Sequence, residues 1–182
     1  MDAELLELSA KAREEGKKYE KKRFIYPKVM EYLPQRIFLA LVGPRGAGKT
    51  IILKQMLSET DSSFYISLDT QKPENGLFSF AKEASENGIK LLLLDEVHAY
   101  PNFEMEIKKI HDFLDIKVVF TSSSSISLHE SAYDLSRRVR LLQVAPFSFR
   151  EFLFFEKKGP FPQLTFDAMV GEKSAREYYG KT

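Results

Sequence analysis

A glycine-rich segment from Gly43 to Ile51 has the residue types that hold a phosphate group. Its sequence GPRGAGKT fits the spacing GxxxxGK[ST], with an apolar run before it and a helical pattern after it. Glycines let backbone N–H groups approach a phosphate closely, and the start of the following helix adds positive charge. Lys49 is placed to reach the β- and γ-phosphate oxygens, and the Thr50 hydroxyl to bind Mg²⁺. We therefore expect a nucleotide to bind along Gly43, Pro44, Arg45, Gly46, Ala47, Gly48, Lys49, Thr50 and Ile51.

Two carboxylates, Asp95 and Glu96, follow the apolar run LLLL at residues 91–94. In an open α/β sheet, ligands bind at the carboxyl ends of the strands, where this pair would lie. We expect Asp95 to hold Mg²⁺ through its water shell, and Glu96 to polarise a water molecule for attack on the γ-phosphate. The alternative is that the two carboxylates form a surface pair that caps the next segment. Because Asp95 and Glu96 follow the glycine-rich segment after one strand and one helix, we favour the catalytic interpretation.

Glu96 also separates the classes of nucleotide enzyme. Small-molecule kinases exclude water and do not need such a base, while the NKxD motif of GTPases and the LSGGQ motif of ABC transporters are absent from the sequence. These features favour hydrolysis of ATP to ADP and phosphate with Mg²⁺. The alternative is a nucleotide-gated module whose conformation is read by a nucleic acid or a protein, with little hydrolysis. The basic stretch from Lys17 to Lys28 would support a nucleic-acid partner.

Further polar residues follow or precede apolar runs. Either Thr121 or Ser122 would sense the γ-phosphate or hold the attacking water, although a serine-rich turn also explains them. Either Arg137 or Arg138 would act as an arginine finger that stabilises charge on the transferred phosphoryl group, or lie solvated at a helix end. His98 is interpreted as a structural residue or as a support for the acidic pair.

The composition limits the class of protein. The chain has 182 residues, with 27 Lys and Arg against 26 Asp and Glu, and no cysteine. This balance excludes a uniformly basic nucleic-acid coat, and the lack of cysteine excludes disulfides, a thiol nucleophile and thiolate metal sites. The apolar runs are far shorter than a membrane span, and the charged start is unlike a secretory signal. The composition predicts a cytoplasmic protein without membrane contact.

Strand-length apolar runs alternate with helical patterns along the chain. Because the runs lack polar alternation, they predict a parallel sheet that is buried on both faces. The expected fold is a three-layer α/β/α P-loop NTPase core with a mainly parallel five-stranded sheet and right-handed crossovers. Strands are expected at residues 36–42, 64–68, 89–94, 117–120 and 139–144. Helices are expected at residues 4–22, 49–57, 77–87, 103–114 and 126–136, and from residue 148, with a break at Pro27 and Pro34.

The start of the final helix and the domain limits can also be predicted. Ser148 and Glu151 have the spacing of a capping box, with Phe147 and Phe152 placed for a hydrophobic staple.

We expect a charged N-terminal helix in residues 1–24, the ATPase core in residues 25–156, and a linker or the start of a lid or C-terminal region in residues 157–182. Because so few residues follow the core, we expect the chain to be the N-terminal core of a longer ATPase.

Five segments of the chain resemble a known family. GPRGAGKT, FYISLD, LLLLDEVH, VVFTSSS and RVRLLQVAPFSFREF occur in the order seen in predicted AAA+-type ATPases common in archaea and bacteria. The resemblance covers roughly residues 25–155. Members look like an AAA core followed by a C-terminal domain, often winged-helix or restriction-nuclease-like. The resemblance thus implies nucleic-acid or protein partners through a further domain. If the isolated chain hydrolyses ATP slowly, we expect the missing part to be an arginine from a neighbouring copy in a homo-oligomer.

The resemblance also assigns roles to single residues. Arg138 falls on the arginine of the family's L-x-G-R-V stretch, whereas Ser122 and Arg137 stand where relatives usually have glycine. By the same likeness, the segment that contains Tyr26, Pro27 and Val29 would line an adenine pocket. Four residues would carry the roles argued above, namely Lys49, Thr50, Asp95 and Glu96.

Overall fold

The computed structural model describes residues 2–123 and 135–156. Residues up to Pro146 form one compact unit, and Phe147 begins a second unit. The helices of the first unit are α1 (Ala3–Lys17), α2 (Tyr26–Glu31), α3 (Lys49–Glu59), α4 (Leu77–Glu86), the short 3₁₀ helix η1 (Val97–Ala99) and α5 (Phe103–Phe113). Its strands are β1 (Phe38–Val42), β2 (Ser63–Ser67), β3 (Leu91–Asp95), β4 (Lys117–Ser122) and β5 (Val139–Gln143). In the second unit the structure describes α7 (Phe149–Phe155).

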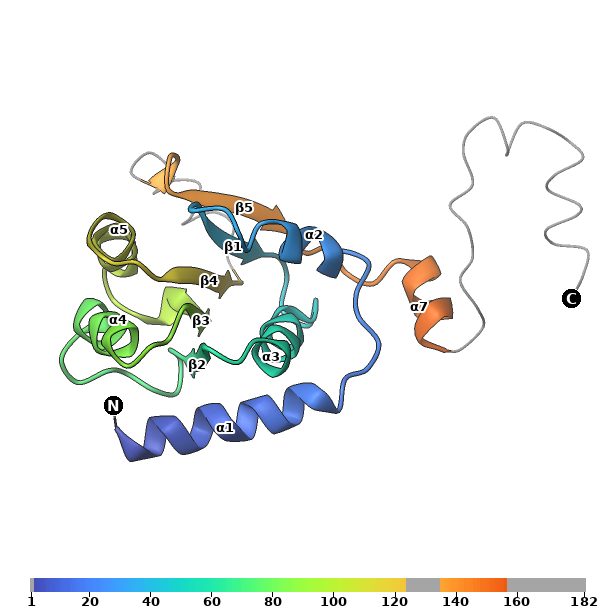
Figure 1. The fold of residues 1–182 in the computed structure, drawn as a ribbon. Helices are drawn as coiled ribbons and strands as arrows, with labels where there is room; N and C mark the ends of the chain where they lie inside the picture. Colours follow the sequence, from blue (N-terminus) through green and yellow to red (C-terminus); the bar gives the residue numbers. More distant parts are fainter. Residues whose placement is uncertain (1, 124–134, 157–182) are drawn as a thin grey trace, which may run out of the picture. The chain divides into compact units, whose positions relative to one another are not determined.

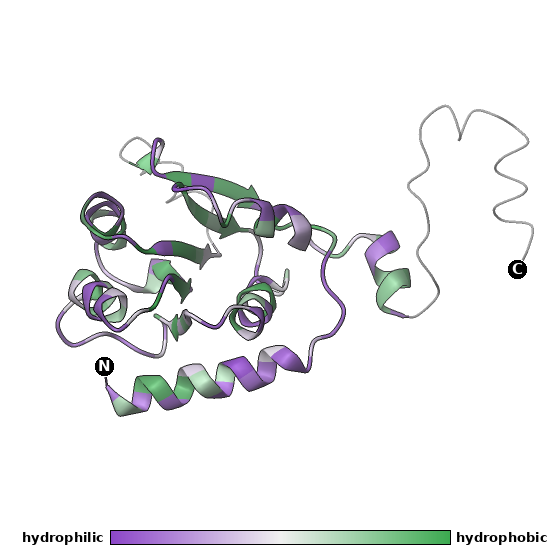
Figure 2. Cartoon of the chain, viewed as in Figure 1, coloured by the Kyte–Doolittle hydropathy of each residue, from purple (hydrophilic) through white to green (hydrophobic). Residues whose placement is uncertain are grey.

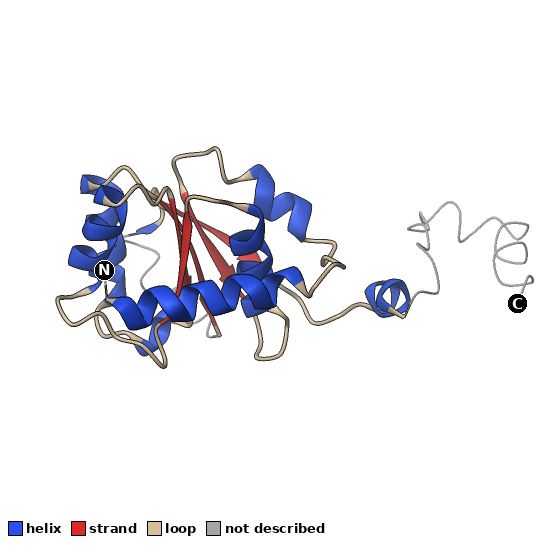
Figure 3. Cartoon of the chain, turned by 60° about the horizontal axis from the view of Figure 1, so that its bottom comes forward, coloured by secondary structure: helices blue, strands red, loops and turns tan. Residues whose placement is uncertain are grey.

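The five strands form one sheet in the order β2-β3-β4-β1-β5, and every pairing is parallel. This confirms the predicted P-loop NTPase-like core. Helices cover both faces of the sheet (Figure 1), and the view in Figure 3 shows the strands between them. The predicted helix over residues 126–136 falls largely on residues 124–134, outside the described part of the chain.

Each face of the sheet packs its own apolar core. Alternate residues of the central strands point to opposite sides: Ala40 packs in the core formed with α4 and α5, while its neighbours Leu39 and Leu41 pack in the core formed with α3. Every residue of β1 and β3 is buried. The strands consequently read as continuous apolar runs, and they are coloured mainly as hydrophobic in Figure 2.

Helix α1 docks on α3 through a face of small residues rather than lying solvated. Its buried residues are Ser9, Ala12 and Gly16, which recur at helical spacing. Arg13 reaches past them to the C-terminal end of α3, where it donates to the carbonyls of Leu57 and Thr60. A charged residue of this predicted helix therefore fixes it to α3, and α1 ends at Lys17 instead of residue 22.

Helix α2 lies where a break was expected, so that expectation was wrong. Pro27 occupies the first turn of α2, where the missing N–H is not needed. Lys117 at the start of β4 fastens the turn that follows, because its ammonium donates to the carbonyls of Tyr32 (2.8 Å) and Gln35 (2.7 Å). Proline thus begins this helix rather than ending regular structure.

The start of α7 confirms the predicted capping box. The Ser148 hydroxyl accepts from the Glu151 N–H, and the Glu151 carboxylate accepts from the Ser148 N–H. The ring of Phe147 lies 5.0 Å from that of Phe155, edge to face. The hydrophobic staple between Phe147 and Phe152 stays a prediction. Phe152 stacks with Phe149.

We predict that Gly16→Ala destabilises the protein. A Cβ at Gly16 would overlap the backbone carbonyl of Lys54 on α3. Such overpacking costs about 1–3 kcal/mol, measured as a fall in the free energy of unfolding in urea. Without this contact, replacing a glycine by alanine in a helix interior would raise the free energy of unfolding by about 1 kcal/mol, because alanine favours the helix. Lys17→Ala, which removes an exposed pair with Glu14, serves as the control and should change stability by less than about 1 kcal/mol.

Candidate functional site

The glycine-rich segment forms the connection between β1 and α3, at the carboxyl edge of the sheet. Gly46 and Gly48 have φ values of 80° and 84°, in the left-handed region that favours glycine. Gly48 is also the N-cap residue of α3, so the free N–H groups at the start of this helix belong to the segment. Gly43 has a different role, because a Cβ there would overlap the carbonyl of Val144 after β5.

The side chain of Lys49 is folded over this loop. It is 4% exposed, and its ammonium donates to the carbonyls of Gly43 (2.9 Å) and Pro44 (3.0 Å). These carbonyls satisfy a buried cation that would otherwise be costly. The Lys49 ammonium is thereby held at the loop, and its flexible side chain can reach an anionic group that binds there.

The Asp95 carboxylate is buried at the end of β3 and held from both neighbouring strands. It is 3% exposed, and it accepts hydrogen bonds from the hydroxyls of Tyr65 on β2 (2.9 Å) and Thr121 on β4. Burial raises the pKa of the Tyr65 hydroxyl, and the Asp95 charge raises it further, so this hydroxyl remains a donor. Sequence reasoning missed Tyr65, which reads as one apolar residue in the strand FYISL.

Glu96 leaves the strand in a left-handed conformation, with φ of 52°. Its N–H donates to the Thr121 hydroxyl oxygen (2.9 Å), so Thr121 contacts both members of the acidic pair. The buried Oε2 of Glu96 has no hydrogen-bond partner within residues 2–123 and 135–156, and it lies 3.2 Å from Nδ1 of His98. Nε2 of His98 lies 3.2 Å from the Ser123 hydroxyl. His98 thus stands between Glu96 and the end of β4.

Lys49, Asp95 and Glu96 line one cleft of about 690 Å³. Its walls come from the glycine-rich loop and the start of α3, the ends of β2 and β3, and one side of α1. Loop residues Arg45, Gly46, Gly48, Lys49 and Thr50 lie along it with Asp95 and Glu96, and Lys11 and Glu15 of α1 complete the rim. The acidic pair and six of the nine residues expected to bind nucleotide therefore line one cleft, whereas Gly43, Pro44 and Ala47 do not line it.

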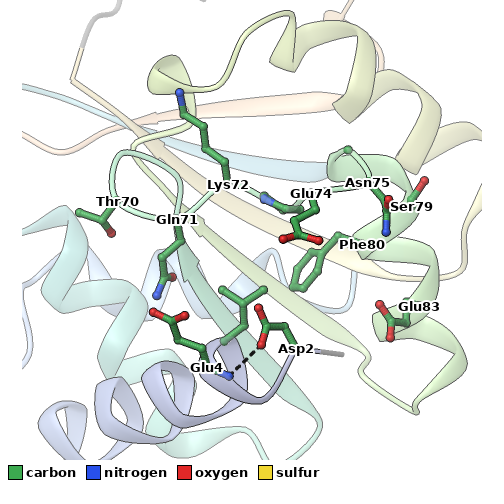
Figure 4. Close-up of a pocket in the computed structure, with 13 residues that line it drawn as sticks. Asp2, Glu4, Thr70, Gln71, Lys72, Glu74, Asn75, Ser79, Phe80 and Glu83 are labelled. Atoms are coloured by element: carbon green, nitrogen blue, oxygen red, sulfur yellow. Dashed lines mark hydrogen bonds between the residues drawn. The ribbon is translucent and has the colours of Figure 1, made fainter.

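A second hollow, of about 580 Å³, lies beside the N-terminal end of α1 and the segment before α4. Figure 4 shows the carboxylates of Asp2, Glu4, Glu74 and Glu83 around it, with Lys72 the one labelled lysine. Such a lining repels a polyphosphate. Of these two hollows, the cleft along the glycine-rich loop, which is lined by Arg45, Lys49 and Lys54, is consequently the candidate site for an anionic ligand.

The donor set in the cleft fits Mg²⁺. The Thr50 hydroxyl and the Asp95 carboxylate are oxygen ligands, which this ion prefers, and both line the cleft. No group of three or more His, Cys, Asp and Glu that could hold a metal occurs in the described residues. Mg²⁺ is usually bound by one or two carboxylates together with substrate phosphates, so a larger protein cluster is not required.

Arg138 lies at the amino ends of the strands, opposite the carboxyl ends where the cleft lies. It precedes β5, whose first residue pairs with Phe38 at the start of β1, whereas the glycine-rich loop follows the end of β1. Five strand residues separate the two edges, about 15 Å at ~3.3 Å per residue. Arg138 forms a two-pronged pair with Asp112 (2.7 and 2.8 Å), and its hydrogen bonds lower the pKa of Asp112 to about 2. Arg138 therefore cannot reach the cleft of its own chain.

The residues suggested for an adenine pocket do not line the cleft. Tyr26 and Val29 are 3% and 0% exposed in the core beside α3, and the Tyr26 hydroxyl donates to Glu59 (2.8 Å). Pro27 is exposed. The basic stretch around them is partly used within the chain: Lys22 pairs with Glu59, and Arg23 is buried.

Taken together, the parallel sheet and the loop between β1 and α3 define a nucleotide-binding protein of the P-loop NTPase type. A family model described as "AAA domain" matches residues 35–153, and the chain belongs to this family. It is also 34% identical over 158 residues to the uncharacterized protein MJ1637 of Methanocaldococcus jannaschii, an alignment that covers 76% of this chain. The chain spans about one third of that relative's length. None of the helices within the described ranges is long and apolar enough to cross a membrane.

We predict that Tyr65→Phe lowers the free energy of unfolding by about 1.5–3 kcal/mol. The change removes one hydroxyl donor from the buried Asp95 carboxylate and leaves the ring in place. Tyr32→Phe is the matched control, because the Tyr32 hydroxyl makes no hydrogen bond in the described residues and the substitution should alter stability by less than ~0.5 kcal/mol. Equal effects of the two changes in urea unfolding would contradict the role given to Tyr65.

Proposed function

We propose that this chain is the core of a Mg²⁺-dependent ATPase that hydrolyses ATP to ADP and phosphate. One observation carries the proposal: the phosphate-type loop with Lys49 lines the same cleft as Asp95 and Glu96, which Thr121 joins by hydrogen bonds. Membership of the AAA domain family supports nucleotide binding by this cleft. Because the chain spans a third of its relative, we assign recognition of a nucleic-acid or protein partner to the remainder of a longer protein.

In this mechanism the loop binds and orients the phosphates. The N–H groups of the loop, apart from that of Ala47, which donates to the carbonyl of Pro44, contact the β- and γ-phosphate oxygens together with the positive end of α3. Lys49 exchanges the carbonyls of Gly43 and Pro44 for a phosphate oxygen. Thr50 and Asp95 would hold Mg²⁺, which neutralises charge on the phosphates when bound.

Glu96 acts as the general base. Its carboxylate takes a proton from a water molecule while the water oxygen bonds to the γ-phosphorus. The bond from the γ-phosphorus to the bridging oxygen breaks, and that oxygen leaves on ADP with the electron pair. Thr121 positions the groups that take part in this step. Thr121, the candidate sensor, accepts from the Glu96 N–H and donates to Asp95, so we assign it the positioning of the Asp95 carboxylate and of the Glu96 backbone.

We predict that Glu96→Gln binds ATP but hydrolyses it about 10²- to 10⁴-fold more slowly, since glutamine keeps the shape of the side chain and cannot accept the proton. Lys49→Ala should lose both binding and hydrolysis. Glu74→Gln, an exposed acid outside the cleft, is the matched control and should behave as the original chain does. Binding is measured with a fluorescent ATP analogue, and hydrolysis by phosphate release without an acceptor.

The outcomes separate the candidate functions. Normal hydrolysis by Glu96→Gln would refute its role as the base. Nucleotide binding without phosphate release by the original chain would instead favour the gated interaction module. In that module, a nucleic-acid partner on Lys17 to Lys28 would have to displace the pair between Lys22 and Glu59.

Arg138 is proposed to complete the cleft of a neighbouring copy, since it lies at the opposite edge from its own cleft. An arginine supplied in this way raises hydrolysis by about 10³- to 10⁵-fold. We predict that Arg138→Ala and Lys49→Ala are each inactive alone and that their mixture regains phosphate release. Asp112→Asn removes the charge partner and keeps the arginine, so it should retain activity. Failure of the mixture to regain activity would contradict action between copies.

A further inference from the structure

Arg23 is a buried arginine that joins the glycine-rich loop to the end of the first unit. Its side chain is 7% exposed and comes from the segment between α1 and α2. One terminal nitrogen donates to the carbonyl of Ala47 (2.5 Å), and the other to those of Ala145 (3.0 Å) and Pro146 (3.5 Å). Arg23 lies before residue 35, where the match to the family model begins.

The bond to Ala47 constrains the next N–H group of the loop. No peptide bond described in the structure is cis, so the Ala47 carbonyl and the Gly48 N–H point in opposite directions from one peptide plane. Arg23 holds this carbonyl on the side of the loop that faces the protein. The Gly48 N–H is thereby turned to the other side, which is where an anion would contact the loop. The Ala47 N–H is fixed as well, because it donates to the carbonyl of Pro44 (3.2 Å).

A constraint of this kind matters because of the glycines. Gly46 and Gly48 both have positive φ values, and glycine leaves the peptide planes on either side free to rotate. A loop that must order itself when it binds a ligand loses affinity, whereas a preorganised loop does not. A guanidinium offers several N–H donors in a rigid fork and no acceptor, which suits a cluster of carbonyls.

We propose that Arg23 is a positioning residue of the nucleotide site, which presets the Ala47–Gly48 peptide for phosphate binding. The proposal rests on the binding of nucleotide by this loop, as proposed above. The segment before residue 35 then belongs to the nucleotide site as much as to the core. Arg23 touches the loop backbone and acts through it, so its loss weakens the binding of ADP and of ATP alike.

Arg13 provides a matched comparison within the same chain. It also extends from the N-terminal segment and donates to backbone carbonyls, those of Leu57, Thr60 and Ser63, at the other end of α3. Both arginines clamp irregular backbone next to α3, but only Arg23 contacts the loop at the site. A role limited to folding predicts the same behaviour for both residues.

The test is the affinity of the whole chain for ADP, which is independent of hydrolysis. We expect Arg23→Met to raise the Kd for ADP by roughly 10- to 100-fold, as the loss of a hydrogen bond from a charged group does. Arg13→Met should leave this Kd within about twofold while lowering the urea midpoint of unfolding. Arg23→Lys keeps the charge and loses the fork, and it should give an intermediate Kd. In steady-state hydrolysis, Arg23→Lys should raise KM for ATP and leave kcat within about twofold.

Each outcome bears on the proposal. Equal effects of Arg23→Met and Arg13→Met on the Kd would overturn it, as would a fall in kcat at unchanged KM for Arg23→Lys. If Arg23→Met does not fold, the Arg23→Lys variant decides, and an unchanged Kd for ADP in that variant overturns the proposal. A chain with native arginines that binds neither ADP nor ATP would instead refute the proposed function itself.

Discussion

A carboxylate buried at the end of an apolar strand is the constraint on which the site depends. Asp95 is almost fully buried, and an unpaired charge there would be very costly. The parallel sheet solves this problem, because β2 and β4 end beside β3 and bring Tyr65 and Thr121 to the two carboxylate oxygens. The same Thr121 fixes the backbone of Glu96. The groups assigned to metal binding and to water activation are thus oriented by one network.

Helix α3 carries the other half of the site, and the N-terminal segment fixes it at both ends. Arg13 binds carbonyls around its C-terminal end, and Arg23 binds the loop before its first turn. Between them, the small face of α1 lies against α3, where a Cβ at Gly16 would overlap the carbonyl of Lys54. The segment that was predicted only as a charged N-terminal helix is consequently a structural support for the loop that precedes α3.

The parts of the fold that depend on local pattern could be predicted from the sequence. Continuous apolar runs indicated the buried parallel strands, and the spacing of Ser148 and Glu151 indicated a capping box that the structure contains. The rest depends on contacts between distant segments. Nothing near Tyr65 in the sequence indicates that its hydroxyl reaches Asp95, and nothing near Arg23 indicates that it is buried against Ala47. Arg138 lies at the amino ends of the strands because Val139 pairs with Phe38. The local sequence around Arg138 does not reveal this pairing.

The contact between α1 and β2 has a consequence for self-association. Strand β2 is at the edge of the sheet, where unpaired N–H groups can recruit strands of other molecules. The Tyr65 N–H is instead bonded to the Ser9 hydroxyl (3.1 Å), and α1 lies along this edge. A chain that began at residue 35, the first matched to the family model, would lack this cover. The N-terminal helix thus shields the molecule from edge-to-edge aggregation at β2, the strand whose Tyr65 donates to Asp95 on β3.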